Sequence, residues 1–430
     1  MKPNLKTFCP LPWIHLSARS DGSGRLCCKA HEFPLKNNQG EVVFWQNSDN
    51  VHSYFNSEEY KKIRLQMLRG KQPSHCVSCF EQESHGGHSQ RQAALNEYGT
   101  HKRIIDSLIR STNSDGSIDH PKHLYLDMTL GNKCNLKCRM CHPWSSYIIG
   151  RDWKKMGKEF NEEETKKILQ NEWYASPDFF QFVRSALPFV EEINTTGGEP
   201  FLIKEHFSIL KMIIEEGHSD HISLRYNTNY TVIPDQMVKL WKSFKKVTVN
   251  CSVEACGELN DYIRYPSKWN QLEKNMYALD ELAFQNPHIN ILIHTTLQAY
   301  NVLRIPEFLD WLRQADFKAV FRFPGLDLVQ SPEWLHPGIY PQNLRSEIAD
   351  KILESVDHHE PFFLNYNEGP YREHSRERIQ ILRDFSEMIR TDSSQERYFE
   401  SFIKETKAHD TLRRQSVTYV LPELKPFFVD

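Results

Sequence analysis

The stretch GNKCNLKCRMCHPW, Gly131 to Trp144, places three cysteines within eight residues. They are Cys134, Cys138 and Cys141, in the spacing C-x3-C-x2-C. The run before them, HLYLDMTL, is short and apolar, as is typical of a buried strand. Because loops after parallel strands meet at the carboxyl edge of a sheet, where active sites form, we expect these thiols to lie at a functional edge.

Short apolar runs alternate with longer helical patterns from about residue 122 onward. Strands separated by helices are typical of repeated β-α units around a parallel sheet. We therefore predict an α/β fold, in the form of a partial (β/α)6 TIM-like barrel. The predicted strands are HLYLDMTL (123–130), EEINTTG (191–197), HISLRYNTN (221–229), KVTVNCSVEA (246–255), INILIHTTLQ (289–298) and KAVFRFP (318–324).

The length of 430 residues favours more than one part. We expect an irregular, cysteine-rich N-terminal module over 1–110, a core over 120–330 and a charged helical region over 331–430. The stretch STNSDGSIDH, residues 111–120, is the best candidate for a linker.

Composition narrows the class of protein. We find no apolar run long enough to span a membrane and no N-terminal secretory signal, so the sequence predicts a cytoplasmic protein whose ten cysteines stay reduced. A net charge of -3 provides no general attraction to nucleic acid, which disfavours that class of partner.

Three closely spaced thiolates suit an iron-sulfur site. They can hold three irons of a 4Fe-4S cluster and leave the fourth iron open for chemistry. The alternatives are a zinc site or unrelated core thiols, but zinc generally takes four ligands, and His142 beside Cys141 is poorly placed to be the fourth.

The cysteine spacing after the first barrel strand resembles that of the radical S-adenosylmethionine (radical SAM) superfamily. The second predicted strand ends in TGGEP, Thr196 to Pro200, which is similar to the family's GGE motif for the methionine amino group. Gly197 and Gly198 would let the backbone approach a ligand, and Glu199 offers a carboxylate to an ammonium group. The resemblance covers about residues 120–325.

Other positions match the family by placement and are expected to contact SAM. Asn227 and Asn229 resemble the ribose motif, and Glu254 ends the fourth strand where relatives often carry an acidic residue. Arg264 resembles the arginine directed at the SAM carboxylate, a task for a planar cation with paired donors. Met140 occupies the family's apolar position near adenine.

The N-terminal cysteines resemble the auxiliary-cluster part of SPASM or twitch domains. Cys9, Gly22 and Cys27 follow C-x12-G-x4-C, and Cys76 and Cys79 form C-x2-C. The resemblance implies a second 4Fe-4S cluster held by the four thiols, with a four-cysteine zinc site as the alternative.

This module departs from the family, because it precedes the barrel and lacks the downstream cysteines of a full SPASM set. His85 and His88 stand where more ligands would be, although a solvated loop is the simpler interpretation of ESHGGHSQ. Cys28 is an alternative ligand to Cys27. We prefer Cys27 because its spacing from Gly22 matches the pattern C-x12-G-x4-C.

Two cysteines remain. Strand alternation sends Cys251 to the face opposite Glu254, which predicts buried packing. Cys256, just past the strand end, is a candidate hydrogen-atom donor.

The resemblance implies that reductive cleavage of SAM yields a 5'-deoxyadenosyl radical that abstracts a hydrogen from the substrate. Auxiliary-cluster relatives favour a peptide or protein substrate, and a small polar metabolite comes second. RNA modification and a zinc-stabilised binding protein on a degenerate barrel stay open. A flavodoxin or ferredoxin would supply the electron.

Overall fold

The computed structural model describes residues 6–30, 34–37, 39–47, 54–84, 89–99, 102–119, 124–366 and 370–429. Its contacts divide the chain into two compact units. Unit 1 comprises Met1–Asn132, Lys166–Tyr226 and Lys239–Lys245. Unit 2 comprises Lys133–Thr165, Asn227–Val238 and Lys246–Asp430. The three domains expected from the sequence stay a prediction.

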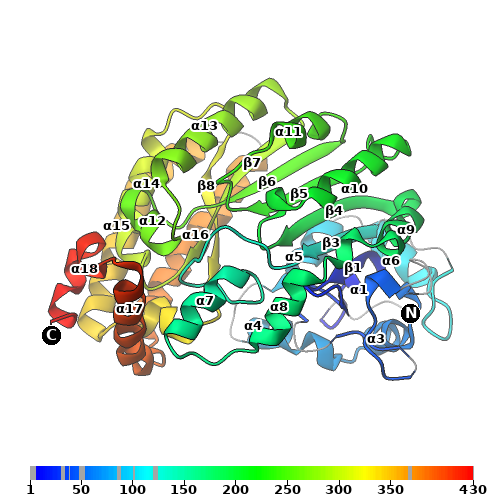
Figure 1. The fold of residues 1–430 in the computed structure, drawn as a ribbon, viewed down its shortest axis with the longest axis horizontal. Coiled ribbons are helices and arrows are strands. Elements are labelled where there is room, and N and C mark those ends of the chain that lie inside the picture. The colour runs from blue at the N-terminus through cyan, green and yellow to red at the C-terminus, as the bar shows by residue number, and fades with distance from the viewer. Residues whose placement is uncertain are drawn as a thin grey trace. The chain divides into compact units, whose positions relative to one another are not determined.

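The described residues form eight strands in the order β2-β1-β3-β4-β5-β6-β7-β8 (Figure 1). The pairs β1–β3, β3–β4, β4–β5, β6–β7 and β7–β8 are parallel, and helices separate successive strands from β3 onward. The predicted α/β class with an open, partial barrel is therefore confirmed. The six predicted strands correspond to β3 Leu124–Leu130, β4 Val190–Gly197, β5 Ser223–Thr228, β6 Lys246–Ser252, β7 Ile289–Leu297 and β8 Phe321–Leu328.

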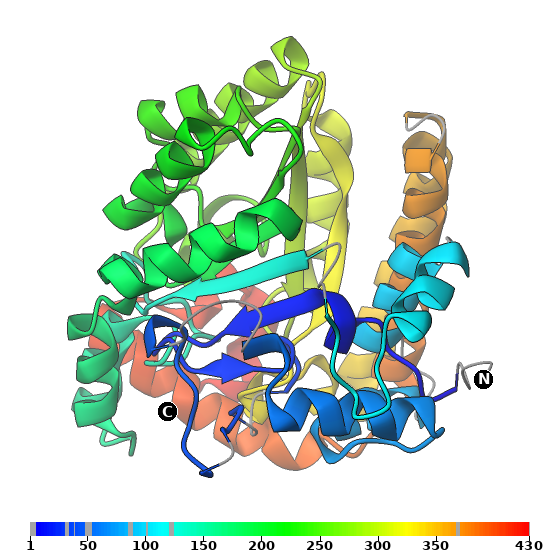
Figure 2. The same cartoon turned by 90° about the vertical axis from the view of Figure 1, so that its right-hand side faces the viewer.

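Two strands of the N-terminal segment escaped the sequence analysis. They are β1, His15–Ala18, which runs parallel to β3, and the antiparallel β2, Gly24–Arg25 (Figure 2). Between them Gly22 has a φ of 87°, and a Cβ there would lie 2.6 Å from the Gln46 side chain and 2.8 Å from Trp173. The glycine of the C-x12-G-x4-C pattern is therefore required by the turn and its packing.

The core of unit 1 includes a buried aromatic cluster that contains Trp45, Trp173 and Phe182. The predicted linker forms a turn at Gly116, where a Cβ would lie 2.4 Å from the carbonyl of Lys61. The helices of unit 1 are α1 Leu11–Ile14, α3 Glu58–Leu68, α4 Val77–Ser84, α5 Gln90–Gly99, α6 Lys102–Arg110, α9 Pro177–Ala186 and α10 Lys204–Glu215.

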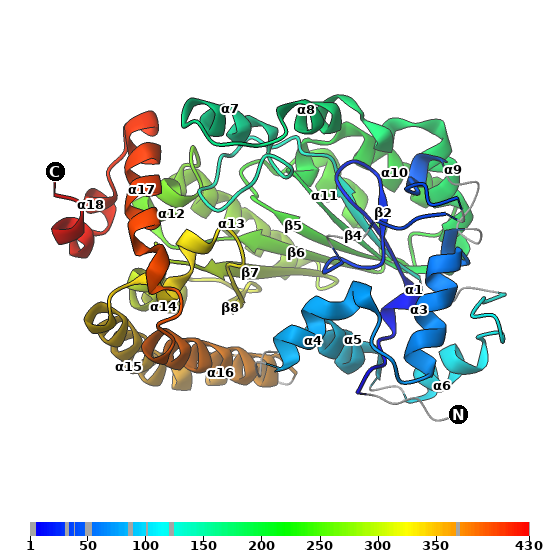
Figure 3. The ribbon, with the colours of Figure 1, turned by 90° about the horizontal axis from the view of Figure 1, so that it is seen from below.

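Unit 2 contains β6 to β8 and the predicted C-terminal helical region (Figure 3). Its helices are α7 Tyr147–Lys155, α12 Gly257–Ile263, α13 Trp269–Gln285, α14 Ile305–Gln314, α15 Gln342–Tyr366, α16 Pro370–Thr391, α17 Phe399–Arg413 and α18 Val417–Val420. Helices α8 Glu162–Gln170 and α11 Asp235–Trp241 are shared between the units. Among the described residues, no helix has both the length and the apolar character needed to cross a membrane.

Candidate functional site

The cysteine loop, residues 133–146, lies in unit 2 and is held by its backbone. The amides of Lys137 and Arg139 donate to the carbonyls of Tyr265 at 2.6 Å and Ile263 at 2.8 Å. The Cys141 amide donates to the Cys138 carbonyl at 2.9 Å, which closes a turn between two of the thiols. The last residue of α12 and the segment just after it therefore fix the backbone on both sides of Cys138.

The three thiols of this loop, the cysteine triad, lie close enough to influence one another electrostatically. Burial raises the pKa of Cys141, and the neighbouring Cys138 and Cys134 raise it further. Burial also raises the pKa of Cys138, whereas Arg264 lowers it. Such a site resists forming free thiolates, but a bound metal favours thiolate ligands. The donor set therefore fits an iron-sulfur cluster.

Asn229 ties the end of β5 to the loop. Its Nδ2 donates to Asn135 Oδ1 at 2.9 Å and approaches Cys134 Sγ at 3.7 Å. Its Oδ1 accepts from the backbone and hydroxyl of Thr231. The ribose contact of Asn229 stays a prediction; in the structure its amide points toward the Cys134 sulfur. Asn227 is exposed and accepts a hydrogen bond from Asn250 at 2.9 Å.

Glu254 and Arg264, predicted as separate SAM contacts, form a buried ion pair at 2.8 Å. The other Glu254 oxygen accepts from the Thr296 amide at 2.8 Å. Burial raises the pKa of Glu254, and Arg264 opposes that shift. The Nε of Arg264 is buried without a hydrogen-bond partner. Met140 is half-buried in the turn between Cys138 and Cys141.

The TGGEP motif lies in unit 1, at the end of β4. Gly197 has a φ of 137°, and a Cβ there would lie 2.8 Å from the carbonyl oxygen of Leu130 on β3. The Gly198 amide donates to Gly131, and Thr196 Oγ1 lies 3.3 Å from Thr129 Oγ1. Gly197 is therefore required by strand packing as well as by any ligand. Glu199 is buried and accepts from the Phe201 amide at 3.1 Å.

The four N-terminal thiols expected to act together line one cavity of unit 1. This cysteine quartet is Cys9, Cys27, Cys76 and Cys79. Burial raises the pKa values of Cys9, Cys27 and Cys76, and nearby thiols raise each further. None of the four is in a disulfide. Thiols converging from three segments supply the donor chemistry of a closed four-ligand site.

Cys27 and Cys28 differ in their position relative to the cavity of the quartet. Cys28 is not among the residues that line the cavity, and its charge environment includes Cys27 and Asp127. Arg91 lines the cavity, pairs with Glu83 and donates to the Phe8 carbonyl at 3.0 Å. His85 and His88 lie outside the described residues.

The remaining cysteines lie elsewhere in unit 2. Cys251 is completely buried on β6. Cys256 precedes α12, and its thiol approaches the Glu307 carbonyl at 3.9 Å in a hollow lined by α12, α14 and α18. Burial raises the pKa of Cys256 to about 11. That hollow contains none of the residues predicted to contact SAM.

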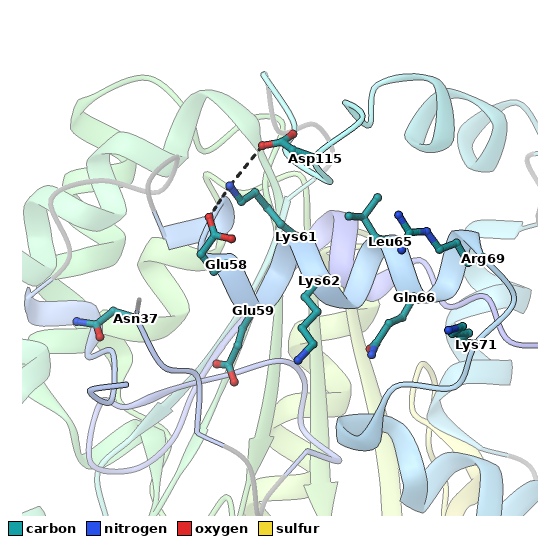
Figure 4. A pocket seen from close by; sticks show the side chains of 10 residues that line it. All are labelled: Asn37, Glu58, Glu59, Lys61, Lys62, Leu65, Gln66, Arg69, Lys71 and Asp115. Carbon is teal, nitrogen blue, oxygen red and sulfur yellow. Dashed lines mark hydrogen bonds and ion pairs between the residues drawn. The ribbon is translucent and has the colours of Figure 1, made fainter. Parts of the chain in front are cut away.

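A second hollow of unit 1 carries no thiols. It lies along α3, where Lys61 bridges Glu58 and Asp115 at 2.6 and 3.3 Å (Figure 4). Its charged side chains are typical of a solvated surface. Among the described residues, no three Cys, His, Asp or Glu side chains stand ready to share one metal ion. The fit to iron-sulfur clusters therefore rests on the donor chemistry and on the shared cavity.

Sequence reasoning missed the charged residues around the triad. Asp152 of α7 pairs with Lys137 at 2.8 Å and with Arg413 of α17 at 3.1 Å. Asp410 of α17 pairs with Arg139 at 2.6 Å. These ion pairs join segments that are far apart in the chain, so no local sequence motif predicts them.

Comparison with known families matches residues 128–312 to the radical SAM superfamily. This segment is therefore similar to the radical SAM superfamily. The superfamily implies an enzyme with a 4Fe-4S cluster and bound SAM. The residues described above fit both groups in donor chemistry.

Curated relatives that match this part of the chain carry the name GTP 3',8-cyclase. The protein from Mannheimia succiniciproducens is 23% identical over 215 residues, 49% of this chain and 55% of the relative. The protein from Clostridium acetobutylicum is 26% identical over 195 residues, 44% of this chain and 52% of the relative. The chain thus spans about half the length of these relatives.

Two solved structures resemble the chain. Streptococcus suis SuiB bound to S-adenosylmethionine has 16% sequence identity and a TM-score of 0.38, covering 74% of this chain and 67% of SuiB. Native anSMEcpe with bound AdoMet has 17% identity and a TM-score of 0.39, covering 57% of this chain and 62% of anSMEcpe.

Proposed function

We propose that the protein is a radical SAM enzyme whose cysteine triad holds the SAM-binding 4Fe-4S cluster. The cluster, when reduced, supplies the electron that cleaves SAM to methionine and a 5'-deoxyadenosyl radical, which takes a hydrogen from the substrate. The observation that carries the proposal is the tethered loop with three neighbouring thiols inside the segment that is similar to the radical SAM superfamily.

The chain's own residues would bind and orient SAM. Glu199 would accept from its ammonium group, and Arg264 would donate to its carboxylate while Glu254 keeps that guanidinium in place. Asn229 would position Cys134, and its neighbour Asn227 would offer its amide to a ribose hydroxyl. Thr196, Gly197, Gly198 and Met140 are the other residues proposed to contact SAM.

The cysteine quartet would hold a second 4Fe-4S cluster. Four thiols lining one cavity support this role, and Cys27 is the preferred ligand over Cys28. A cluster with four protein ligands has no open iron, so it would relay an electron or position the substrate. A structural zinc ion uses the same donor set and is the alternative.

For the substrate, we propose a peptide or protein, because of the resemblance of the quartet to SPASM and twitch modules. A small polar molecule, such as a nucleotide, is the second candidate, since the curated relatives are named GTP 3',8-cyclase. A flavodoxin or ferredoxin would supply the electron. Cys256 remains a proposed hydrogen donor, although the structure places it in a separate hollow.

The proposal is tested by anaerobic reconstitution with iron and sulfide, followed by reduction with dithionite in the presence of SAM. We expect about eight irons per chain, from two clusters of four, and formation of 5'-deoxyadenosine detected by chromatography. Adding a peptide pool or GTP should raise that rate only for the correct substrate class. A reconstituted protein that binds zinc alone and leaves SAM intact would refute the radical mechanism.

A further inference from the structure

Helix α17 is fastened to the chain on both sides of Cys138. Lys137 pairs with Asp152, which in turn pairs with Arg413 of α17. On the other side, Arg139 pairs with Asp410 of the same helix. All these residues belong to unit 2, where α17 contacts α7 (Figures 1 and 3). Helix α17 therefore packs against the cysteine loop through these ion pairs.

Arg413 has an unusual environment for a buried cation. Its side chain is 1% exposed, and its Nε donates to Asp152 at 3.1 Å. Both terminal nitrogens, Nη1 and Nη2, are buried without a hydrogen-bond partner. The guanidinium lies 5.1 Å from the ring centre of Tyr265, the residue whose carbonyl holds the Lys137 amide. Its charge is also felt by the Cys138 thiol.

Arg139 shows what a structural arginine looks like in the same place. Its Nε donates to the Tyr262 carbonyl at 3.0 Å, and its Nη2 donates to Asp410 and Gln415. Only its Nη1 is buried without a hydrogen-bond partner, whereas Arg413 lacks a partner at both terminal nitrogens. Its guanidinium also lies 3.6 Å from the ring centre of Tyr262. Burying unpaired donors is costly, so a fold that only needed packing would gain little from Arg413.

We infer that Arg413 is an anion-binding residue of the cofactor site, with Nη1 and Nη2 directed at a negative group held by the cysteine loop. The inference rests on the proposed function and extends it to helix α17. Two sources share the required chemistry: the thiolate-ligated cluster at Cys138 and the carboxylate of SAM. A planar guanidinium with paired donors suits either one.

The test compares the variants Arg413→Met and Arg413→Lys with wild-type protein and with Arg414→Met, a change at the exposed next residue. Three quantities are measured: the urea unfolding free energy of the metal-free protein, the midpoint potential of the reconstituted cluster without SAM, and the Kd for SAM. The variant Arg139→Met serves as the structural reference.

We expect Arg413→Met to keep the unfolding free energy of the metal-free protein, because Lys137 still neutralises Asp152. If the cluster is the anion, the midpoint potential falls; a tenfold change in the reduction equilibrium is about 59 mV for one electron. If SAM is the anion, the potential is unchanged and the Kd rises at least tenfold. Arg413→Lys should recover part of either effect, and Arg414→Met should show neither.

Other results would overturn the inference. Arg413→Met that loses stability or fails to fold, as we expect of Arg139→Met, would make Arg413 structural. A folded Arg413→Met with wild-type potential and wild-type Kd would also overturn it, while leaving the proposed function intact. A wild-type protein that binds neither iron nor SAM would refute both.

Discussion

The two cysteine sites use opposite ways of assembling thiols. The quartet collects four cysteines from separate N-terminal segments around one cavity, beside the paired Arg91. The triad takes three cysteines from one loop, with the cationic side chains of Arg264 and Arg413 close to Cys138. A four-thiol set can saturate a cluster, whereas a three-thiol set leaves one position for another ligand.

The number of thiols at each site indicates where a substrate or cofactor could bind the metal. With the proposed second cluster, the quartet would offer stability and an electron path, since its ligands would close the site. The triad offers an open position, and the cations nearby suit an anionic ligand. The comparison predicts that damage to each site will have a different signature.

The largest expected effect is the complete loss of SAM cleavage in Cys138→Ala. This change would remove one of the three proposed ligands of the open cluster. A Cys76→Ala, Cys79→Ala double variant should still form 5'-deoxyadenosine without substrate, because SAM cleavage needs only the open cluster and an electron. The measurement is 5'-deoxyadenosine per chain after dithionite reduction.

Its control is iron content together with circular dichroism, because an N-terminal segment can depend on its metal for structure. Each variant should keep about half of the iron. A folded quartet variant that also modifies substrate at the wild-type rate would reduce the quartet to a structural role, such as that of zinc.

An intermediate effect is expected for the SAM pocket. Glu199→Ala should weaken SAM binding by about 1 to 3 kcal/mol without loss of iron, because a charge-assisted contact is removed. Arg264→Gln should do the same, but it also leaves Glu254 buried and unpaired. The double variant Arg264→Gln, Glu254→Gln removes that complication, and calorimetry reports the Kd.

Glu162→Ala, which breaks an exposed ion pair with Lys154, is the matched surface control. If the double variant binds SAM as tightly as wild type, Arg264 and Glu254 form a structural pair, and another cation must hold the SAM carboxylate.

The smallest effect on SAM chemistry is expected from two buried histidines, one in each unit, which instead make the unfolding free energy depend on pH. Burial lowers the pKa of His206 in unit 1 and of His409 in unit 2 from 6.5 to about 3, and Arg139 and Arg413 add to the shift of His409. Unfolding therefore takes up protons below pH 6.5. Stability is complete above that pH and falls toward pH 3, by up to about 1.4 kcal/mol per pH unit for each histidine.

The variants His206→Phe and His409→Phe should each flatten the fall in urea unfolding free energy between pH 6.5 and 5. If unit 1 unfolds first in acid, His206→Phe should restore more of the unfolding free energy. If unit 2 unfolds first, His409→Phe should restore more of it. An unchanged slope in both variants would mean that other groups control acid stability.

The helical and strand patterns of this chain are local, and the sequence predicted them well. All six strands from β3 to β8 were anticipated, because apolar alternation and flanking turns act over a few residues. The triad was visible for the same reason, since its ligands share one loop. In contrast, β1 and β2 have only four and two residues, too short for a periodic signal, and β1 depends on pairing with β3.

The sequence by itself therefore determined the α/β fold, the thiol spacing and the cluster chemistry that this spacing suits. Only the tertiary structure decided which charges surround those thiols. It paired Arg264 with Glu254, turned Asn229 toward Cys134 and placed Arg413 beside the cysteine loop. The physical reason is distance along the chain: Asp152 and Arg413 are 261 residues apart, and no local rule brings such residues together.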